Sequence, residues 1–436
     1  MKPKFSLANF SSFSGTLCLA LLVGLITALG CICFHLLIEF FTQFFFGVVE
    51  NDTFISTLST LTTLERILIP ASGGLLVGII LTYLHVTEAE GEGVPQVLRA
   101  IVFKKSKIRL LVAPIKILTT AITLGSGGSA GREGPIVQIG SAIGSSVGQL
   151  LKQNESTTKL LLAAGAAAGI GGTFGAPLAG ILFSLELILK TITLRIVFIL
   201  GAAAFLSNYL VSGVLGFEGL RLILPNSFII NIDLILVSLI LGAISGVLAV
   251  YFGRTIKLME TFFHWLRTPL FIKTTIGGLL IGFLALYFPY IHEPATYPLM
   301  VDLLAISNLP LLFLIGLLFV KIVATAITIG SGGSGGVLAP ALLTGLIFGY
   351  VMAMFIPGLG WNVTADVIAF GLIGMAGVFA GVTHAPFMST ILLYEITDEP
   401  MVIPLIALST AVSYFTAKYL SSESVYTEHM SKRRIV

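Results

Sequence analysis

The chain has 436 residues, of which 56% are hydrophobic and only 10% are charged, and its formal net charge is +3. Soluble proteins carry about 25% charged residues, so this composition excludes a soluble enzyme, a nucleic-acid-binding protein and a disordered scaffold. It indicates an all-α, polytopic membrane protein that is integral to a lipid bilayer. Cys18, Cys31 and Cys33 share one apolar stretch and indicate neither a disulfide framework nor a metal site, and we expect no cofactor.

Apolar segments recur along the chain and predict membrane helices. The first begins at Leu17, after Met1-Lys2-Pro3-Lys4, and continues to Phe46. It is much longer than the apolar core of about 7–15 residues in a secretory signal, which indicates an uncleaved first membrane helix. The further predicted spans are Ile67–Leu84, Leu110–Gly125, Leu160–Ile170, Leu178–Leu189, Ile196–Val214, Leu234–Phe252, Thr275–Phe288, Leu309–Ile329, Ala339–Ile356, Val367–Val382, Met388–Tyr394 and Val402–Tyr419. Several are well short of the ~20 residues that cross a bilayer, which is typical of broken or re-entrant helices that line a protected cavity.

Positive charge is concentrated in three short segments outside the predicted spans. They are Lys2 with Lys4, Lys104-Lys105-Ser106-Lys107 with Arg109, and Lys432-Arg433-Arg434. The positive-inside rule places all three segments, and therefore both termini, in the cytoplasm. Because Val436 follows soon after the last predicted span, we expect one transmembrane domain over residues 1–436 and no sizeable regulatory domain after it.

One segment of the chain is repeated. Lys116–Ser129 recurs almost verbatim as Lys321–Ser334, at an offset of 321 − 116 = 205 residues. The same offset relates Pro135 to Pro340, Gly140 to Gly345 and Gly144 to Gly349, while Ala176-Pro177 with Glu186 matches Ala385-Pro386 with Glu395 at 386 − 177 = 209. Two halves, at about residues 13–215 and 230–430, with broken helices at equivalent positions predict a transport site at their interface. The alternative is a glycine-rich packing motif that was duplicated for structural reasons.

The glycine–proline breaks predict helices that begin at equivalent places. Val94-Pro95, Gly134-Pro135 and Ala339-Pro340 each put a proline at an expected helix start, where unpaired N–H groups point out of the helix. Each such end carries a partial charge of roughly +0.5, so several converging ends would bind an anion without a fixed cation. This kind of site is weak enough to release the ion again, as conduction requires.

Four short segments carry most of the remaining information. They are Gly91-Glu92-Gly93-Val94-Pro95, Gly131-Arg132-Glu133-Gly134-Pro135, Gly335-Gly336-Val337-Leu338-Ala339-Pro340 and Ser424-Val425-Tyr426. In this order they resemble the GSGIP, GREGP and GGxFxP motifs and the pore-tyrosine segment of the CLC family of chloride channels and proton–chloride exchangers. The resemblance covers most of the chain and is to bacterial members without a C-terminal regulatory domain.

The resemblance implies an inverted repeat of two antiparallel halves and a homodimer with one pore per subunit, in a bacterial inner or plasma membrane. Chloride is the implied transported ion, with or without protons, and no nucleic acid is involved. Glu133 is the implied gating carboxylate, which occupies an anion site and swings away. The implied anion-binding residues are Gly93, Val94, Ile136, Val337, Leu338 and Tyr426, and the implied selectivity-motif residues are Gly91, Glu92, Pro95, Gly131, Arg132, Gly134, Pro135, Gly336 and Pro340.

The physics of membrane burial agrees with a functional Glu133. A carboxylate at membrane depth is costly and is by default a functional residue, while the structural alternative is a salt bridge between Glu133 and Arg132. The sequence also departs from the GGxFxP motif, because Leu338 stands where that motif has phenylalanine. Fluoride-selective relatives fit less well, because Pro135 follows Gly134 as in the chloride branch.

Two further departures concern protons. Glu92 replaces the serine of GSGIP, and its side chain either titrates in the anion path or turns to the cytoplasmic vestibule. Leu187 stands where exchangers of this family usually carry an inner proton-accepting glutamate, although some exchangers lack it. We therefore predict a gated chloride channel with weak or absent proton coupling, and a proton-coupled chloride antiporter is the alternative. Glu186 and Glu395 are duplicated, which favours a structural role for Glu186.

Two other interpretations follow from single residues. Lys116 and Lys321 either snorkel or pair at a helix flank, or else act in the anion path. Gly332-Gly333-Ser334-Gly335 with His384 would fit an intramembrane serine protease, which would make the protein an enzyme. That remote alternative leaves Arg132, Glu133 and the repeat unexplained, and we expect a protein that is not an enzyme.

Overall fold

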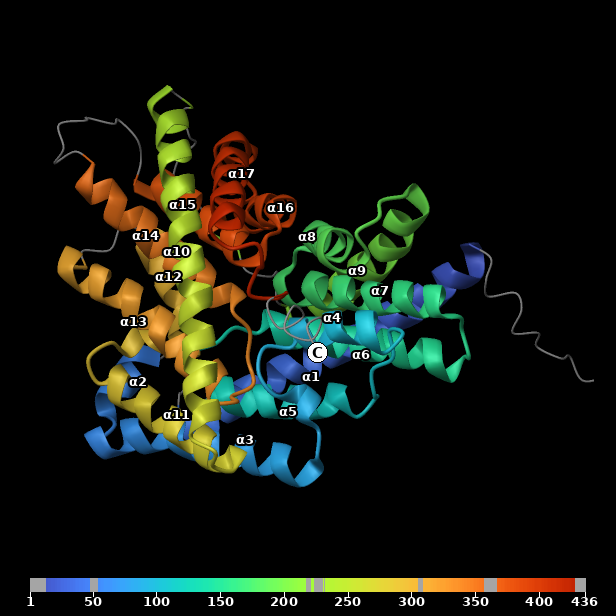
Figure 1. Ribbon diagram of the computed structural model, residues 1–436, viewed down its shortest axis with the longest axis horizontal. Coiled ribbons are helices and arrows are strands. Elements are labelled where there is room, and N and C mark those ends of the chain that lie inside the picture. Colours follow the sequence, from blue (N-terminus) through green and yellow to red (C-terminus); the bar gives the residue numbers. More distant parts are fainter. Residues whose placement is uncertain are drawn as a thin grey trace, which may run out of the picture.

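The computed structural model describes residues 13–47, 54–216, 221–222, 230, 232–304, 309–356 and 367–427. The described part of the chain is all-α, as predicted, and Figure 1 shows its helices. The charged segments at Lys2 with Lys4 and at 432–434 lie outside these residues. The placement of both termini in the cytoplasm therefore stays a prediction.

The α-helices differ widely in length. In chain order they are α1 (Phe13–Phe46), α2 (Phe54–Thr60), α3 (Thr63–Leu84), α4 (Val94–Phe103), α5 (Val112–Gly125), α6 (Glu133–Leu150), α7 (Glu155–Phe174), α8 (Pro177–Phe183), α9 (Leu194–Leu215), α10 (Ile232–Trp265), α11 (Leu270–Ala285), α12 (Thr296–Leu304), α13 (Leu311–Gly330), α14 (Leu338–Phe355), α15 (Val367–Thr383), α16 (Pro386–Thr397) and α17 (Ile403–Leu420). Short helical turns between them are η2 (Thr87–Ala89), η3 (Ser184–Leu189), η4 (Pro289–Ile291), η5 (Glu293–Ala295) and η7 (Pro400–Val402).

Long apolar helices confirm a polytopic membrane protein. Within the described residues, 7 helices are long and apolar enough to cross a membrane. Further apolar helices, such as α4, α5 and α11, have only 10–17 residues. The predicted mixture of full and broken spans is therefore present.

The predicted spans missed some helices and misjudged others. Helix α6 was absent from the predicted spans because its glycine, serine and glutamine residues dilute its apolar character, although 16 of its 18 residues are buried in the protein. Helix α10 continues to Trp265, beyond the predicted end at Phe252, because Arg254 and Lys257 interrupt the apolar pattern but not the helix. Hydropathy finds helices that face lipid better than helices that face protein.

The repeated segments meet around a local two-fold centre. Gly131 N donates to Gly336 O, and Gly336 N donates to Gly131 O, both at 2.7 Å, in an antiparallel bridge. Around it, Ser129 N donates to Thr328 Oγ1 at 3.1 Å and Ser334 N donates to Thr123 Oγ1 at 3.3 Å. Each contact joins a residue of one copy to the other copy, and each has its equivalent 205 residues away (336 − 131 = 205). The repeat is therefore structural as well as sequential, and its copies run antiparallel where they touch.

Equivalent helices also pack in equivalent ways. Helix α6 packs on α7 and α14 packs on α15, while α3 lies against α11 (Figure 1). A Cβ atom at Gly345 would lie 2.7 Å from Met375 Cα, and one at Gly140 would collide with the backbone of Gly165. Small residues at these positions let the helix backbones approach closely. The glycines thus do have the packing role that was the alternative interpretation of the repeat.

The contacts of Glu186 and Glu395 confirm the structural role that was predicted for Glu186 from its duplication. The carboxylate of Glu395, on α16, accepts hydrogen bonds from Leu178 N at 2.9 Å and Ala179 N at 2.7 Å. The carboxylate of Glu186, in η3, accepts from Phe387 N at 3.4 Å and Met388 N at 3.0 Å. Each acid therefore satisfies the unpaired backbone N–H groups at the start of the other half's short helix.

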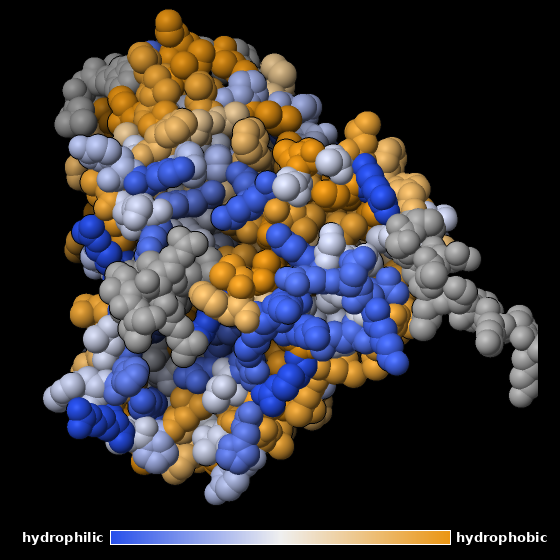
Figure 2. All heavy atoms as spheres, turned by 45° about the vertical axis from the view of Figure 1, so that its right-hand side comes forward, coloured by the Kyte–Doolittle hydropathy of each residue, from blue (hydrophilic) through white to orange (hydrophobic). Residues whose placement is uncertain are grey.

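The surface is divided between polar and apolar areas. Figure 2 shows one face on which hydrophilic side chains gather across the middle, while hydrophobic side chains dominate its upper end. Large exposed apolar side chains include Leu29, Phe44 and Phe198 on the long helices α1 and α9. Such exposure is expected where the neighbouring solvent is a lipid chain.

Candidate functional site

Three of the four motif segments meet at the local two-fold centre. The Gly131–Gly336 bridge joins the second and third segments, and Gly335 N donates to Gly91 O at 3.2 Å, which adds the first. The fourth segment brings Val425, which lines the same cavity as Gly91, Glu92 and Pro95, and Tyr426, which is only 2% exposed. The structure therefore gathers residues from positions 91 to 426 into one place.

Each of the first three segments ends in the start of a helix, as predicted. Helix α4 begins at Val94, α6 at Glu133 and α14 at Leu338, and each carries a proline in its first turn. A Cβ atom at Gly134 would lie 3.1 Å from Gly336 Cα and 3.2 Å from Glu92 Cγ, so only glycine fits there. Because glycine has no side chain, the N-terminal ends of these helices, which carry a partial positive charge, can lie close to one another.

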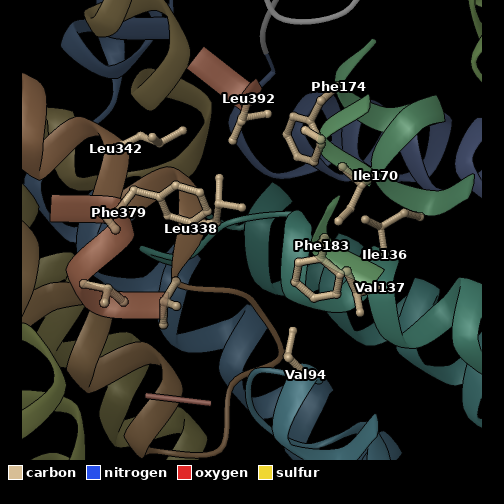
Figure 3. Close-up of a cluster of buried hydrophobic side chains, with 14 of the residues drawn as sticks. Val94, Ile136, Val137, Ile170, Phe174, Phe183, Leu338, Leu342, Phe379 and Leu392 are labelled. Atoms are coloured by element: carbon tan, nitrogen blue, oxygen red, sulfur yellow. The ribbon is translucent and has the colours of Figure 1, made fainter. Parts of the chain in front are cut away.

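The apolar residues predicted around this point are buried together. Val94, Ile136, Val337 and Leu338 are all 2% exposed or less. Figure 3 shows Val94 of α4, Ile136 of α6 and Leu338 of α14 in one cluster with Phe183 and Phe379. Leu338 thus keeps the apolar bulk expected at its position.

Glu133 is buried beside these helix starts. Its side chain is 2% exposed, and its Oε1 atom accepts a hydrogen bond from the Tyr297 hydroxyl at 2.9 Å. Arg132 does not supply the structural salt bridge considered above, because its Nε atom binds Glu293 Oε1 at 2.7 Å. The guanidinium of Arg132 also lies over the Tyr297 ring, 5.0 Å from the ring centre. Glu133 is therefore held by a neutral donor from the other half of the chain.

Sequence reasoning missed Tyr297 and Glu293. Both lie between the predicted spans Thr275–Phe288 and Leu309–Ile329, in a stretch without a recognised motif. The signal that could have found them is the repeat, because α12 is the counterpart of α4 in the element order and begins 296 − 94 = 202 residues after it.

Glu92 is buried at the edge of a cavity. Its side chain is 5% exposed, and its Oε1 atom has no hydrogen-bond partner among the described residues. The cavity has a volume of about 600 Å³, and its charged lining residues are Glu88, Glu90, Glu92, Arg99, Lys104, Lys257, Glu260 and Lys273. Glu92 lies next to Gly134 and also lines this cavity, called the vestibule cavity below, so both predicted roles of Glu92 stay predictions.

Lys116 and Lys321 are fully buried, so the snorkelling interpretation is wrong. Lys116 Nζ donates to Gly91 O at 2.6 Å and to Ala89 O at 3.1 Å. Lys321 Nζ donates to Ile291 O at 2.7 Å and to Thr296 Oγ1 at 2.9 Å. Each lysine thus fixes the short segment that leads to Glu92 or to Tyr297, respectively.

Leu187 lines a different cavity. It lies in η3 and is 7% exposed, at the edge of a cavity of about 680 Å³ that Glu186, His384 and Lys418 also line. The Glu186 carboxylate beside it is engaged by the start of α16. Leu187 itself brings no titratable group to this cavity, which Glu423 also lines.

The residues of the protease interpretation have separate roles. Ser334 Oγ is hydrogen-bonded to Thr120 Oγ1 at 2.7 Å and donates to Ala89 O at 3.2 Å. The His384 ring packs edge-to-face against the Tyr414 ring, with the ring centres 5.8 Å apart. Within the described residues, no serine–histidine hydrogen bond joins them, so a nucleophile activated by His384 is not formed.

Comparisons with known proteins agree with this geometry. The chain is 29% identical over 444 residues to the H(+)/Cl(-) exchange transporter ClcA of Vibrio campbellii, covering 98% of this chain and 92% of that protein. It is 28% identical over 436 residues to the Voltage-gated ClC-type chloride channel ClcB of Salmonella typhi, covering 95% and 99%. Its fold is similar to that of a slow cyanobacterial Cl-/H+ antiporter, with a TM-score of 0.82, 24% identity and coverage of 96% and 97%. A CLC-type fluoride/proton antiporter follows with a TM-score of 0.79, 24% identity and coverage of 95% and 97%. Residues 73–418 match the family described as voltage gated chloride channel, and the chain therefore belongs to this CLC family.

Proposed function

We propose that this protein transports chloride across the membrane along a path between the starts of α4, α6 and α14, with Glu133 as its gate. The observation that carries the proposal is the buried Glu133 carboxyl group, which lies beside helix starts from both copies of the repeat. Relatives named as chloride channels and as chloride exchangers support it. One CLC-type domain over residues 1–436 contains the whole path.

The helix starts bind the anion in this proposal. Their N–H groups and partial positive charges attract chloride, while the Tyr426 hydroxyl adds a hydrogen bond. The ionised Glu133 carboxylate competes for the same positive place, so chloride passes when the carboxylate is protonated or displaced. Because no fixed cation holds the ion, chloride leaves as readily as it enters.

A reconstituted liposome assay tests the proposal. Chloride-loaded vesicles containing the protein are diluted into low-chloride buffer, and efflux is followed with a chloride electrode while valinomycin and potassium hold the membrane potential. Protein-dependent efflux is expected for chloride, with fluoride measured in parallel because one structural neighbour is a fluoride/proton antiporter. Efflux no faster than from empty vesicles would contradict the proposal.

Channel activity and proton-coupled exchange are the two forms that this transport could take. Leu187 favours the channel, since its side chain cannot carry a proton. The placement of Glu92 favours the exchanger, because a buried carboxyl group with an unpartnered oxygen lies between the vestibule cavity and Gly134, next to the gate. Several relatives are named as exchangers, which also supports this second candidate.

Replacing Glu92 with serine is expected to separate the two forms. A chloride gradient is imposed at a fixed potential, and external pH and chloride are recorded together. If the protein is a channel, the wild type transports few protons, and Glu92→Ser raises chloride flux most at alkaline pH. The physical reason is that an ionised carboxylate repels chloride by about 4 kcal/mol at roughly 4 Å and an effective dielectric constant of about 20.

In an exchanger, the wild type moves protons uphill, and Glu92→Ser stops the protons while chloride still flows. Leu187→Ala is the matched control and should leave either behaviour unchanged. Equal stimulation of chloride flux by Glu92→Ser at all pH values would contradict a titrating Glu92. It would instead indicate a carboxylate that repels chloride at every pH tested.

Replacing Tyr426 with phenylalanine is expected to weaken halide binding. The loss of one hydrogen bond corresponds to about 0.5–1.5 kcal/mol. Calorimetric titration of bromide into detergent-solubilised protein measures it, and Tyr394→Phe on α16 serves as the control. Unchanged affinity in both Tyr426→Phe and Tyr426→Ala would remove Tyr426 from the anion site.

The assembly and orientation belong to the same proposal. A homodimer with one path per subunit and cytoplasmic termini follow from the family resemblance and from the positive-inside rule. Light scattering in detergent measures the mass of the particle, and protease digestion of right-side-out vesicles reports which face carries the termini.

A further inference from the structure

Tyr297 and Glu92 lie near the starts of equivalent helices in the two copies of the repeat. Tyr297 is in the first turn of α12 and Glu92 is just before α4, and the two helix starts are 296 − 94 = 202 residues apart. The buried lysine of each copy binds the residue just before, with Lys116 Nζ donating to the backbone oxygen of Gly91 and Lys321 Nζ donating to the side-chain hydroxyl of Thr296. Because the copies run antiparallel at the Gly131–Gly336 bridge, equivalent residues approach it from opposite sides. Glu92 lines the vestibule cavity on its side.

Only one copy of the repeat carries a carboxylate at the position of Glu133. The counterpart of Glu133 is Leu338, since 338 − 133 = 205. Tyr297 donates its hydroxyl hydrogen to Glu133 Oε1 at 2.9 Å. A hydrogen bond donated to a carboxylate stabilises its ionised form. The ionised form is the one that competes with an anion in the proposed gate.

The Tyr297 ring is itself held in place. The guanidinium of Arg132 lies over it at 5.0 Å, and Arg132 is anchored by Glu293, whose side chain is fully buried. Lys321 fixes Ile291 and Thr296 on either side of Glu293. Contacts therefore fix both the segment that carries Tyr297 and one face of its ring, and the hydroxyl group of that ring points to Glu133.

We propose that Tyr297 is a positioning residue that holds Glu133 in its closed place and thereby sets the pH at which the gate opens. The proposal rests on the proposed function of Glu133 as a gate. It assigns to the second half of the chain a direct part in gating, on the side opposite to Glu92. Opening then requires the Tyr297–Glu133 hydrogen bond to break before the carboxyl group moves.

Other ionisable groups face the same place and remain in the variants below. They are Arg132 at the start of α6, His35 on α1, Glu293 in η5, Lys321 on α13, Lys116 on α5, Glu92 before α4 and Tyr426 after α17. The comparison of a variant with the wild type cancels their common contribution to the pH profile. The difference between the two profiles therefore reports the Tyr297 hydroxyl.

The test is Tyr297→Phe, which removes one oxygen and keeps the ring beneath Arg132. Chloride efflux from liposomes is measured between acidic and alkaline pH at a fixed potential. We expect flux at alkaline pH to rise by about threefold to tenfold, which matches the loss of one hydrogen bond from the closed state. The midpoint of the pH profile is expected to move to higher pH by about 0.5–1 unit. The matched control is Tyr290→Phe in η4, whose ring packs on Phe313 and should leave both quantities unchanged.

A second pair of variants keeps the gate proposal and the Tyr297 proposal distinguishable. In a Glu133→Ala background, Tyr297→Phe is expected to have no further effect, since its partner is gone. An unshifted pH profile in Tyr297→Phe, or an equal gain of flux with and without Glu133, would overturn the role of Tyr297. Failure of the wild type to move chloride at all would instead overturn the proposed function.

Discussion

Glu133→Ala is expected to keep chloride flux fast at every pH, whereas wild-type flux falls as the pH rises. The ionised carboxylate lies where three helix starts, those of α4, α6 and α14, present their positive ends. Each end stabilises a negative charge by about 0.3–1 kcal/mol, so removing the competing carboxylate should raise alkaline flux by about tenfold. The measurement is chloride efflux from liposomes across a pH series.

Glu133→Gln separates charge from volume. Its amide mimics the protonated side chain, so we expect a weaker pH response with flux preserved. Glu155→Gln, at the exposed start of α7, is the control and should behave as the wild type. If Glu133→Gln and Glu133→Ala both kept the wild-type rate and pH response, the assignment of Glu133 as the gate would be wrong.

Gly165→Ala is expected to destabilise the fold more than an ordinary glycine substitution in a helix. The added Cβ would collide with the backbone of Gly140, where α6 and α7 cross. Forcing these backbones apart should cost about 1–3 kcal/mol, and it would also displace the helix that begins at Glu133. The fraction of protein that stays monodisperse after heating in detergent measures the loss.

Gly213→Ala is the matched control for this prediction. Gly213 lies in α9, and a Cβ atom there would meet nothing within 4 Å. Alanine favours helix more than glycine does, so this change should leave stability the same or raise it by up to about 1 kcal/mol. Equal losses in both variants would show that close packing of α6 on α7 is not what Gly165 provides.

The sequence by itself determined the class of protein, the repeat and the family. Composition excluded a soluble fold, and the Lys116–Ser129 repeat predicted two halves with an interface between them, where the structure brings the two copies into contact. The duplication of Glu186 and Glu395 likewise predicted a shared structural role. These inferences succeeded because composition, local motifs and repetition are properties of the chain alone.

Only the tertiary structure decided which charged and polar groups face one another. Arg132 and Glu133 are adjacent in the chain, yet Arg132 pairs with Glu293 and Glu133 bonds to Tyr297. Adjacent residues in a helix point about 100° apart, so each meets partners from a different part of the chain. Helix α6 was missed for a related reason, since a helix surrounded by protein need not be apolar in the way that a helix surrounded by lipid must be.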